Sequence, residues 1–187
     1  MNDVAVIMPS IDQEESTKTM NQLIKTAGMD ADFMVLVDKQ RTGFIKTVNN
    51  FVEKTDYKYY VYTAQDSFGG RNWLKIAYDA MQESNKSLFA FNDGKWAGRM
   101  AGFGMVRRSW KSPFFNSDYN ANYADVELTL QALTDDELVV DLSSLLVEVD
   151  PIKHTRSVQL EDKALFAERK KTNFDGTVSD KYIDRWF

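Results

Sequence analysis

The chain has 187 residues, a net charge of −5 at pH 7 and no cysteine, and it is 43% hydrophobic and 27% charged. These values predict one globular domain with a proper core and exclude a disordered chain, a disulfide framework and thiolate metal sites. The acidic balance argues against a general nucleic-acid binder. No apolar run approaches the length of a transmembrane helix, and a strand pattern begins at Val4, so we expect no membrane span, no signal peptide and a cytoplasmic location.

Strand and helix patterns alternate through the first half of the chain. Three apolar runs are typical of buried strands: Val4–Met8, Phe33–Val37 and Tyr57–Thr63. Three segments place apolar side chains at helical spacing: residues 16–27, 42–55 and 72–83. This order predicts a parallel sheet with right-handed crossovers, and therefore an α/β fold with helices on both faces of the sheet.

The pattern is looser in the second half. Leu88–Phe91 predicts a short strand, residues 98–106 a strand or a tight loop, and residues 123–133 a helix. Leu138–Val149 predicts either one long strand or two short ones. The C-terminal segment mixes charged and aromatic side chains, and we expect it to pack across the first part of a single domain.

Polar residues follow three predicted strands where each strand ends. Pro9 and Ser10 follow the first strand, Asp38 the second and Asp66 the third. Because the carboxyl ends of parallel strands share one edge of a sheet, where open α/β sheets bind ligands, these residues are candidates for a binding site. Neither a GxGxxG fingerprint nor a P-loop is present, so a nucleotide would be held by side chains and a metal. For Asp38, capping of a turn is the alternative.

Asp125 opens the predicted helix of residues 123–133. A helix N-terminus favours the ionised form of a carboxylate, which could then accept a proton from a reacting hydroxyl. The alternative is an N-cap that only stabilises the helix. Asp66 and Asp125 therefore offer one carboxylate for a metal and one for a proton.

Charge is unevenly distributed in the second half. Residues 95–111 contain five Lys or Arg and no acid, whereas residues 118–150 contain nine acids and no Lys or Arg. Arg107 and Arg108 could bind a diphosphate, since guanidinium groups bind phosphate in a bidentate manner. Trp110, together with Trp96 and Tyr123, could stack on a sugar or a base. The alternatives are a solvated charged face and ordinary core or rim aromatics.

The order of these elements resembles the family-2-like glycosyltransferases of the GT-A fold. The resemblance implies a three-layer α/β/α sandwich with a mostly parallel central sheet, in one domain of residues 1–187. Its nucleotide-binding half would span about residues 1–90, and its acceptor-side half about residues 91–187. Asp38 would then bind the nucleobase. Asp66, the last residue of the motif Ala64-Gln65-Asp66, would hold Mg²⁺ or Mn²⁺ and the sugar diphosphate.

The resemblance also assigns residues on the acceptor side. Asp125 takes the place of the catalytic base, and His154, in the stretch Asp150–His154, that of a further metal ligand, although a lone histidine is more often structural. Ala64 and Ala124 stand where the family usually has acids. These departures put catalysis in question.

We therefore expect a glycosyltransferase that binds a nucleoside-diphosphate sugar, UDP-linked, and transfers a hexosyl or N-acetylhexosaminyl group with inversion to an unknown acceptor. The first alternative is a non-catalytic nucleotide-sugar-binding or interaction module of the same fold. The second is a GT-A-like nucleotidyltransferase, which the acidic segment 10–16 disfavours, since such enzymes usually have a basic, glycine-rich loop there. A homo-oligomer is compatible with either.

Overall fold

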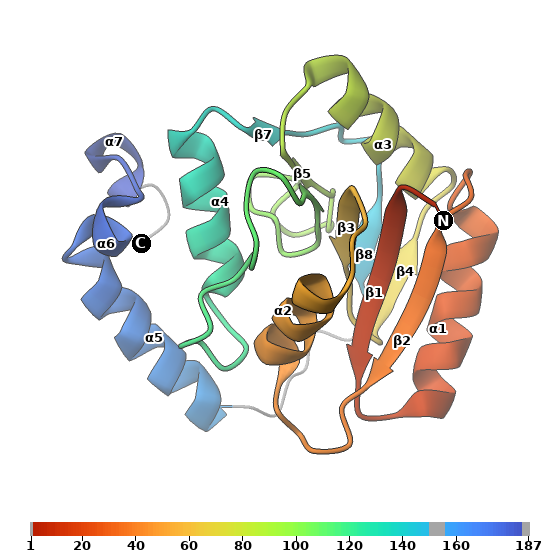
Figure 1. Cartoon of the computed structure of the whole chain (residues 1–187), viewed down its shortest axis with the longest axis horizontal. Helices are drawn as coiled ribbons and strands as arrows, with labels where there is room; N and C mark the ends of the chain where they lie inside the picture. The colour runs from red at the N-terminus through yellow and green to blue at the C-terminus, as the bar shows by residue number, and fades with distance from the viewer. Residues whose placement is uncertain (1, 150–155, 185–187) are drawn as a thin grey trace.

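The computed structural model describes residues 2–149 and 156–184, which form a layered α/β structure (Figure 1). The first half runs β1 (Val4–Ser10), α1 (Gln13–Thr26), β2 (Asp32–Val37), α2 (Phe44–Lys54), β3 (Tyr59–Tyr62), β4 (Ser67–Gly69), α3 (Trp73–Ser84) and β5 (Leu88–Ala90). The second half runs β6 (Gly104–Arg107), α4 (Ala124–Thr134), β7 (Leu138–Val139), β8 (Leu146–Glu148), α5 (Arg156–Lys170), α6 (Asn173–Gly176) and α7 (Asp180–Ile183).

The central sheet has six strands in the order β2-β1-β3-β6-β5-β7. Strands β1, β2 and β3 are parallel, as are β5 and β7, whereas β6 is antiparallel to both of its neighbours, β3 and β5. All strands except β6 therefore run the same way. The predicted mostly parallel α/β sheet is confirmed, with β6 as the one reversed strand of this sheet.

Alternating side chains of the strands pack into two cores, one on each face of the sheet. In β1, Val4 and Val6 lie on one face with apolar residues of α1 and α3, whereas Ala5 and Ile7 lie on the other face with those of α2 and α4. Every residue of β1 and β3 is buried. Continuous apolar strands of this kind are expected where helices cover both faces, so the structure has the predicted three layers.

A second, two-stranded sheet joins β4 to β8 in antiparallel register, with Phe68 opposite Val147. The segment Leu138–Val149 is therefore two short strands, because β7 adds to the central sheet and β8 leaves it to pair with β4. This small sheet begins one residue after Asp66, and the N–H of Val149 donates to the carbonyl oxygen of Asp66 at 2.8 Å. It therefore holds the backbone of the turn that contains Asp66.

The C-terminal helices pack beside α4, which lies between them and the central sheet in Figure 1. Phe166 of α5 and Phe174 of α6 are buried in the same core as Val126 and Leu130 of α4. The N–H of Ser179 donates to Thr134 Oγ1 at the end of α4, at 3.0 Å. The sequence analysis predicts that this segment packs across the first part of the chain. The helices instead cover α4, because their aromatic side chains complete the core around it.

Candidate functional site

The carboxyl ends of β1, β2, β3 and β5 lie at one edge of the central sheet, here called the carboxyl edge. Ser10 pairs with Val37 at the ends of β1 and β2. Tyr62 and Ala90, at the ends of β3 and β5, both pair with Gly104. Chain segments that follow these strands are therefore brought together at this edge, which is where open α/β sheets bind ligands.

Asp38 follows β2 and binds the loop after it. Its Oδ1 accepts hydrogen bonds from the backbone N–H and the hydroxyl of Thr42, at 2.9 and 3.1 Å, and its Oδ2 accepts one from the N–H of Gly43, at 2.8 Å. Burial alone would raise the pKa of Asp38, but the hydrogen bonds from Thr42 and Gly43 outweigh it and lower the pKa. Asp38 thus caps the turn after β2, which was the alternative role left open by the sequence, and its carboxylate is ionised at neutral pH.

Ser10 and Pro9 are both buried at the end of β1. The hydroxyl of Ser10 donates to Gln65 Oε1 at 2.9 Å and accepts a hydrogen bond from the hydroxyl of Ser16. The amide of Gln65 donates to Glu15 Oε2 at 3.1 Å. Ser10 therefore links β1 to the turn after β3, and it acts on that turn through Gln65, the neighbour of Asp66.

Asp66 lies in the turn between β3 and β4, not directly at the end of a strand as expected. The turn is closed by the N–H of Ser67, which donates to the carbonyl of Ala64 at 3.2 Å, and its side of the sheet is the carboxyl edge. Asp66 is half-buried. The second proposed metal ligand, His154, lies outside the described residues, so its relation to Asp66 stays a prediction.

Asp125 is the second residue of α4, since the helix begins at Ala124 and its N-cap is Tyr123. The N-cap alternative for Asp125 is therefore wrong. Its Oδ1 accepts the N–H of Val126 at 3.0 Å. Burial of the Tyr62 phenol, and secondarily the charge of Asp125, raise the pKa of Tyr62 well above its ordinary value. A Cβ atom at Gly102 would lie 3.9 Å from Asp125 Oδ2, and Gly104, two residues later, pairs with Tyr62, so Asp125 lies near the end of β3 at the carboxyl edge.

A fourth carboxylate, Asp93, follows β5 at the same edge. Its Oδ1 accepts three backbone hydrogen bonds, from the N–H groups of Lys95, Trp96 and Ala97, at 3.0, 2.6 and 3.1 Å. A Cβ atom at Gly102 would lie 3.5 Å from Asp93 Oδ2 and 3.9 Å from Asp125 Oδ2. The two carboxylates therefore border one small space that the glycine leaves open.

The sequence contains a signal for Asp93, which is absent from the candidates predicted above. Leu88–Phe91 is a short apolar run, and the Asn92-Asp93-Gly94 that follows repeats the strand-then-Asp pattern that had pointed to Asp38 and Asp66. The pairing of β5 with β6 and β7 then places Asp93 at the carboxyl edge.

The structure does not bring Arg107 and Arg108 to this edge. Arg107 pairs with Tyr59 at the start of β3, three residues of β6 away from Gly104, which is about 10 Å along the strand. Its guanidinium donates to Asn85 Oδ1 and to the carbonyl of Lys86, both at 3.0 Å. The hydrogen bonds of Arg107 thus hold the far ends of α3 and β5, and the expected contact with a diphosphate at the carboxyl edge is not supported.

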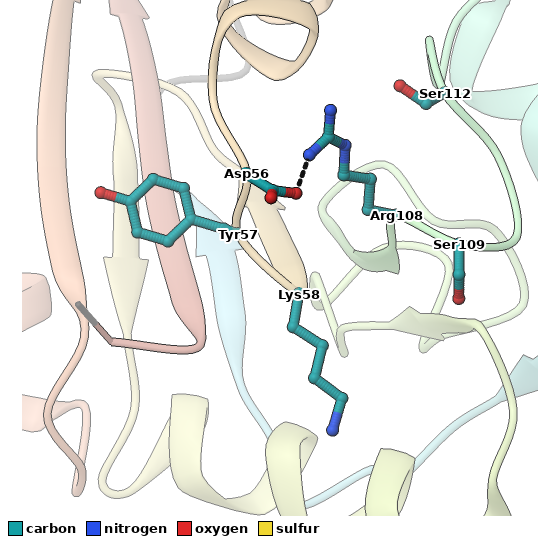
Figure 2. Close-up of a pocket in the computed structure, with 6 residues that line it drawn as sticks. All are labelled: Asp56, Tyr57, Lys58, Arg108, Ser109 and Ser112. Carbon is teal, nitrogen blue, oxygen red and sulfur yellow. Dashed lines mark hydrogen bonds and ion pairs between the residues drawn. The ribbon is translucent and has the colours of Figure 1, made fainter.

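Arg108 lines a hollow at this opposite edge together with Asp56, Tyr57, Lys58, Ser109 and Ser112 (Figure 2). In Figure 2 its guanidinium points to Asp56 and pairs with that carboxylate. Trp110 is also far from Asp125, because its indole N–H donates to Asp135 Oδ2, at 3.0 Å, at the other end of α4. Ten residues of helix correspond to about 15 Å, so Trp110 is not in reach of a ligand beside Asp125.

Within the described ranges, no three side chains of His, Asp or Glu group closely enough to ligate a metal by themselves. The residues at the carboxyl edge nevertheless fit a hard cation, because carboxylate oxygens are the ligands that Mg²⁺ and Mn²⁺ prefer. Mg²⁺ is commonly held by one or two carboxylates together with substrate phosphates and waters. In the same part of the chain, no helix combines the length and apolar character needed to cross a bilayer.

Three solved structures resemble this chain in fold. The mannosyltransferase PcManGT from Pyrobaculum calidifontis, in complex with GDP-Man and Mn²⁺, has a TM-score of 0.67 and 12% identity, over 95% of this chain and 66% of that one. TarS from S. aureus has a TM-score of 0.69 and 10% identity, over 97% and 41%. Glucosyl-3-phosphoglycerate synthase from Mycobacterium tuberculosis, in complex with Mn²⁺, UDP and glucosyl-3-phosphoglycerate, has a TM-score of 0.64 and 9% identity, over 95% and 81%.

The chain therefore has the GT-A-type fold of nucleotide-sugar glycosyltransferases, as the resemblance implied. It spans only 66% and 41% of the length of PcManGT and TarS. No protein-family model matches the sequence, and a search of curated proteins found no match. At 9–12% identity, these likenesses show the fold alone.

Proposed function

We propose that the protein is a glycosyltransferase that binds a nucleoside-diphosphate sugar, UDP-linked, at the carboxyl edge and transfers the sugar with inversion to an acceptor hydroxyl. The observation that supports this most is the placement of Asp38, Asp66 and Asp93 after β2, β3 and β5, with Asp125 near Asp93, at that edge of a GT-A-type fold. Four carboxylates at one sheet edge suit a metal-bound diphosphate, whereas a bare anion site would need cations.

In this proposal Asp38 accepts a hydrogen bond from the base, and Asp66 holds Mg²⁺ or Mn²⁺, with His154 as a further candidate ligand. A bound divalent cation would offset the charge of the departing nucleoside diphosphate. Asp38 accepts hydrogen bonds from Thr42 and Gly43, which hold its carboxylate at the end of β2 in the ionised form that would accept a hydrogen bond from a base.

Asp125 is the proposed general base. It takes the proton of the acceptor hydroxyl as that oxygen attacks C1 of the sugar on the face opposite the diphosphate. The bond from C1 to the diphosphate oxygen breaks, and its electron pair leaves with the nucleoside diphosphate. The position of Asp125 in the first turn of α4 supports this role, because the positive end of the helix dipole favours the carboxylate.

A non-catalytic nucleotide-sugar-binding module is the second candidate. Ala64 and Ala124 favour it, because each stands beside a proposed functional carboxylate where the family usually has an acid. The fold and the binding edge would be the same, and turnover alone would be lost.

Calorimetric titration with UDP, UDP-sugars, GDP and GDP-mannose, each with and without Mn²⁺, tests both candidates. An assay of nucleoside diphosphate release, with water as the acceptor, measures turnover without knowledge of the natural acceptor. Metal-dependent binding with release supports the glycosyltransferase, and binding without release favours the binding module. If no nucleotide binds under any condition, both are rejected.

A further inference from the structure

One face of α5 presents three inward residues in register: Asp162, Phe166 and Arg169. Their spacing of four and three residues places them in a single row along the helix. Asp162 and Phe166 are only 1% and 5% exposed. The side chain of Arg169 is 13% exposed. Figure 1 shows α5 beside α4, and the contacts of this row are with α4 and the loop before it.

Asp162 binds the loop that leads into α4. Its Oδ1 accepts the N–H of Asn120 at 2.9 Å, and its Oδ2 accepts those of Ala121 and Asn122 at 2.9 and 2.7 Å. A carboxylate is buried this completely only when its oxygens are bonded, and three charge-assisted hydrogen bonds from consecutive amides fix the path of the backbone. The last of these amides is three residues before Asp125.

Arg169 binds α4 on the other side of Asp125. Its Nε and Nη2 donate to the two carboxylate oxygens of Glu127, each at 2.8 Å, and Glu127 is 3% exposed. Glu127 Oε2 also accepts the hydroxyl of Tyr119 at 2.9 Å. This two-point pairing of planar groups restricts the rotation of α4 as well as its position.

Asp162 and Arg169 are here called the two anchors of α5, and Phe166 lies between them on the helix. Its ring is 5.1 Å from that of Tyr123, the N-cap residue, which adopts a φ of 66°. The row on α5 thus contacts the chain before the helix, at its N-cap and in its first turn. Asp125 lies in the chain between the residues that Asp162 contacts and the one on α4 that Arg169 contacts.

We propose that Asp162 and Arg169 are positioning residues, which hold Asp125 in the geometry needed to accept the proton of the acceptor. The inference rests on the function proposed above. A catalytic base must lie within hydrogen-bond reach of the proton it takes, and a displacement of about 1 Å can cost about 100-fold in rate. A loop before α4 that was free to move would lose this geometry.

The bland alternative is that the two anchors only attach the C-terminal helices to the domain. The two roles differ in what a mild variant changes. An anchor with only a structural role affects the melting temperature and leaves the kinetics of the folded protein unchanged. A positioning residue lowers kcat and alters its pH profile while leaving donor affinity intact, since the donor is bound by other elements.

The test compares Asp162→Asn with Glu161→Gln, the adjacent carboxylate of α5, which is exposed. We expect Asp162→Asn to lower kcat for nucleoside diphosphate release by about 10- to 100-fold. The acid limb of its kcat–pH profile should shift, with donor affinity by calorimetry unchanged. Hydrogen exchange of the amides of residues 120–122 should become faster. Glu161→Gln should change none of these.

Arg169→Lys is the second variant, because it keeps the charge and removes the two-point pairing with Glu127, together with the Nη1 contact to Asp175. It is used alone if Asp162→Asn does not fold. It should show the same fall in kcat with unchanged donor affinity. If wild type releases nucleoside diphosphate and folded Asp162→Asn or Arg169→Lys releases it at the wild-type rate, the positioning role is overturned and the proposed function stands. If wild type binds donor and releases nothing, the proposed function fails, and this inference with it.

Discussion

At the carboxyl edge of the central sheet, Asp38, Asp66 and Asp93 lie in segments that follow three different strands, and Asp93 and Asp125 border the same space beside Gly102. At the opposite edge, two cations of the basic segment 95–111 are bound to the protein itself, Arg107 to Asn85 and Arg108 to Asp56. The comparison shows that a charged segment in the sequence is not yet a charged site. Direction along the strands decides which edge a residue reaches, and β6 runs the reverse way.

The largest effect should come from the proposed base. Asp125→Asn should lower turnover by roughly 10²–10⁴-fold, because an amide cannot accept the acceptor proton. Donor affinity and melting temperature should change little, since Asp125 does not cap the helix. Rates of nucleoside diphosphate release measure this.

Asp135→Asn is the matched control at the other end of α4, and it should release nucleoside diphosphate at the wild-type rate. Turnover by Asp125→Asn that equals the wild type would remove Asp125 from the chemistry.

Asp66→Asn should abolish the Mn²⁺-dependent part of UDP affinity, because an amide oxygen is a weaker ligand for a hard cation than a carboxylate. Calorimetric titration of UDP with and without Mn²⁺ measures the difference. Asp56→Asn is the comparison at the opposite edge and should bind as wild type does. An unchanged metal dependence in Asp66→Asn would show that the metal assignment is wrong.

Asp38→Ala should weaken uridine and UDP alike, by about 1.5–3 kcal/mol, the usual cost of losing a hydrogen bond to a charged group. The two ligands should lose equal free energy because the contact is to the base. The calorimetric affinity of uridine measures it, and full retention of that affinity would reject the role.

Asp38 should also contribute to stability in a pH-dependent way. Its pKa in the folded protein is below the ordinary 3.8, since hydrogen bonds from Thr42 and Gly43 outweigh burial. A lowered pKa means a contribution that is present above the unfolded pKa and is lost as the pH falls through the folded pKa. The melting-temperature difference between wild type and Asp38→Asn should therefore shrink below about pH 4. A difference that is constant from pH 7 to pH 3 would contradict this.

The smallest effect should come from the opposite edge. Arg108→Gln should leave donor affinity unchanged, because Arg108 pairs with the exposed Asp56 and does not approach the carboxyl edge. A loss of donor affinity of tenfold or more in Arg108→Gln would place the diphosphate at the opposite edge, beside Arg108.

Much of the sheet was predictable because its strands are buried on both faces and therefore read as unbroken apolar runs, as in Val4–Met8. The reversed direction of β6 was not predictable, since the short run Gly104–Arg107 could form a parallel or an antiparallel strand equally well. Arg107 and Arg108 were misplaced for that reason. Asp93 was missed although its local pattern matched that of Asp38.

The contacts of Asp162 and Arg169 could not be predicted from the sequence, because charged residues of this kind usually lie on the solvent-exposed face of a helix. Their role depends on partners about 40 residues earlier in the chain, in the loop before α4 and at Glu127.

The claim that the carboxyl edge binds a metal-bound nucleoside diphosphate is tested most directly by a crystal structure of the protein grown with UDP and Mn²⁺. The proposal predicts the base at Asp38 and the diphosphate and Mn²⁺ at Asp66. Asp125 should face the place that C1 of the sugar would occupy, on the side opposite the diphosphate. A diphosphate bound instead in the hollow beside Arg108 and Lys58, or a crystal without nucleotide at saturating UDP and GDP, would contradict it.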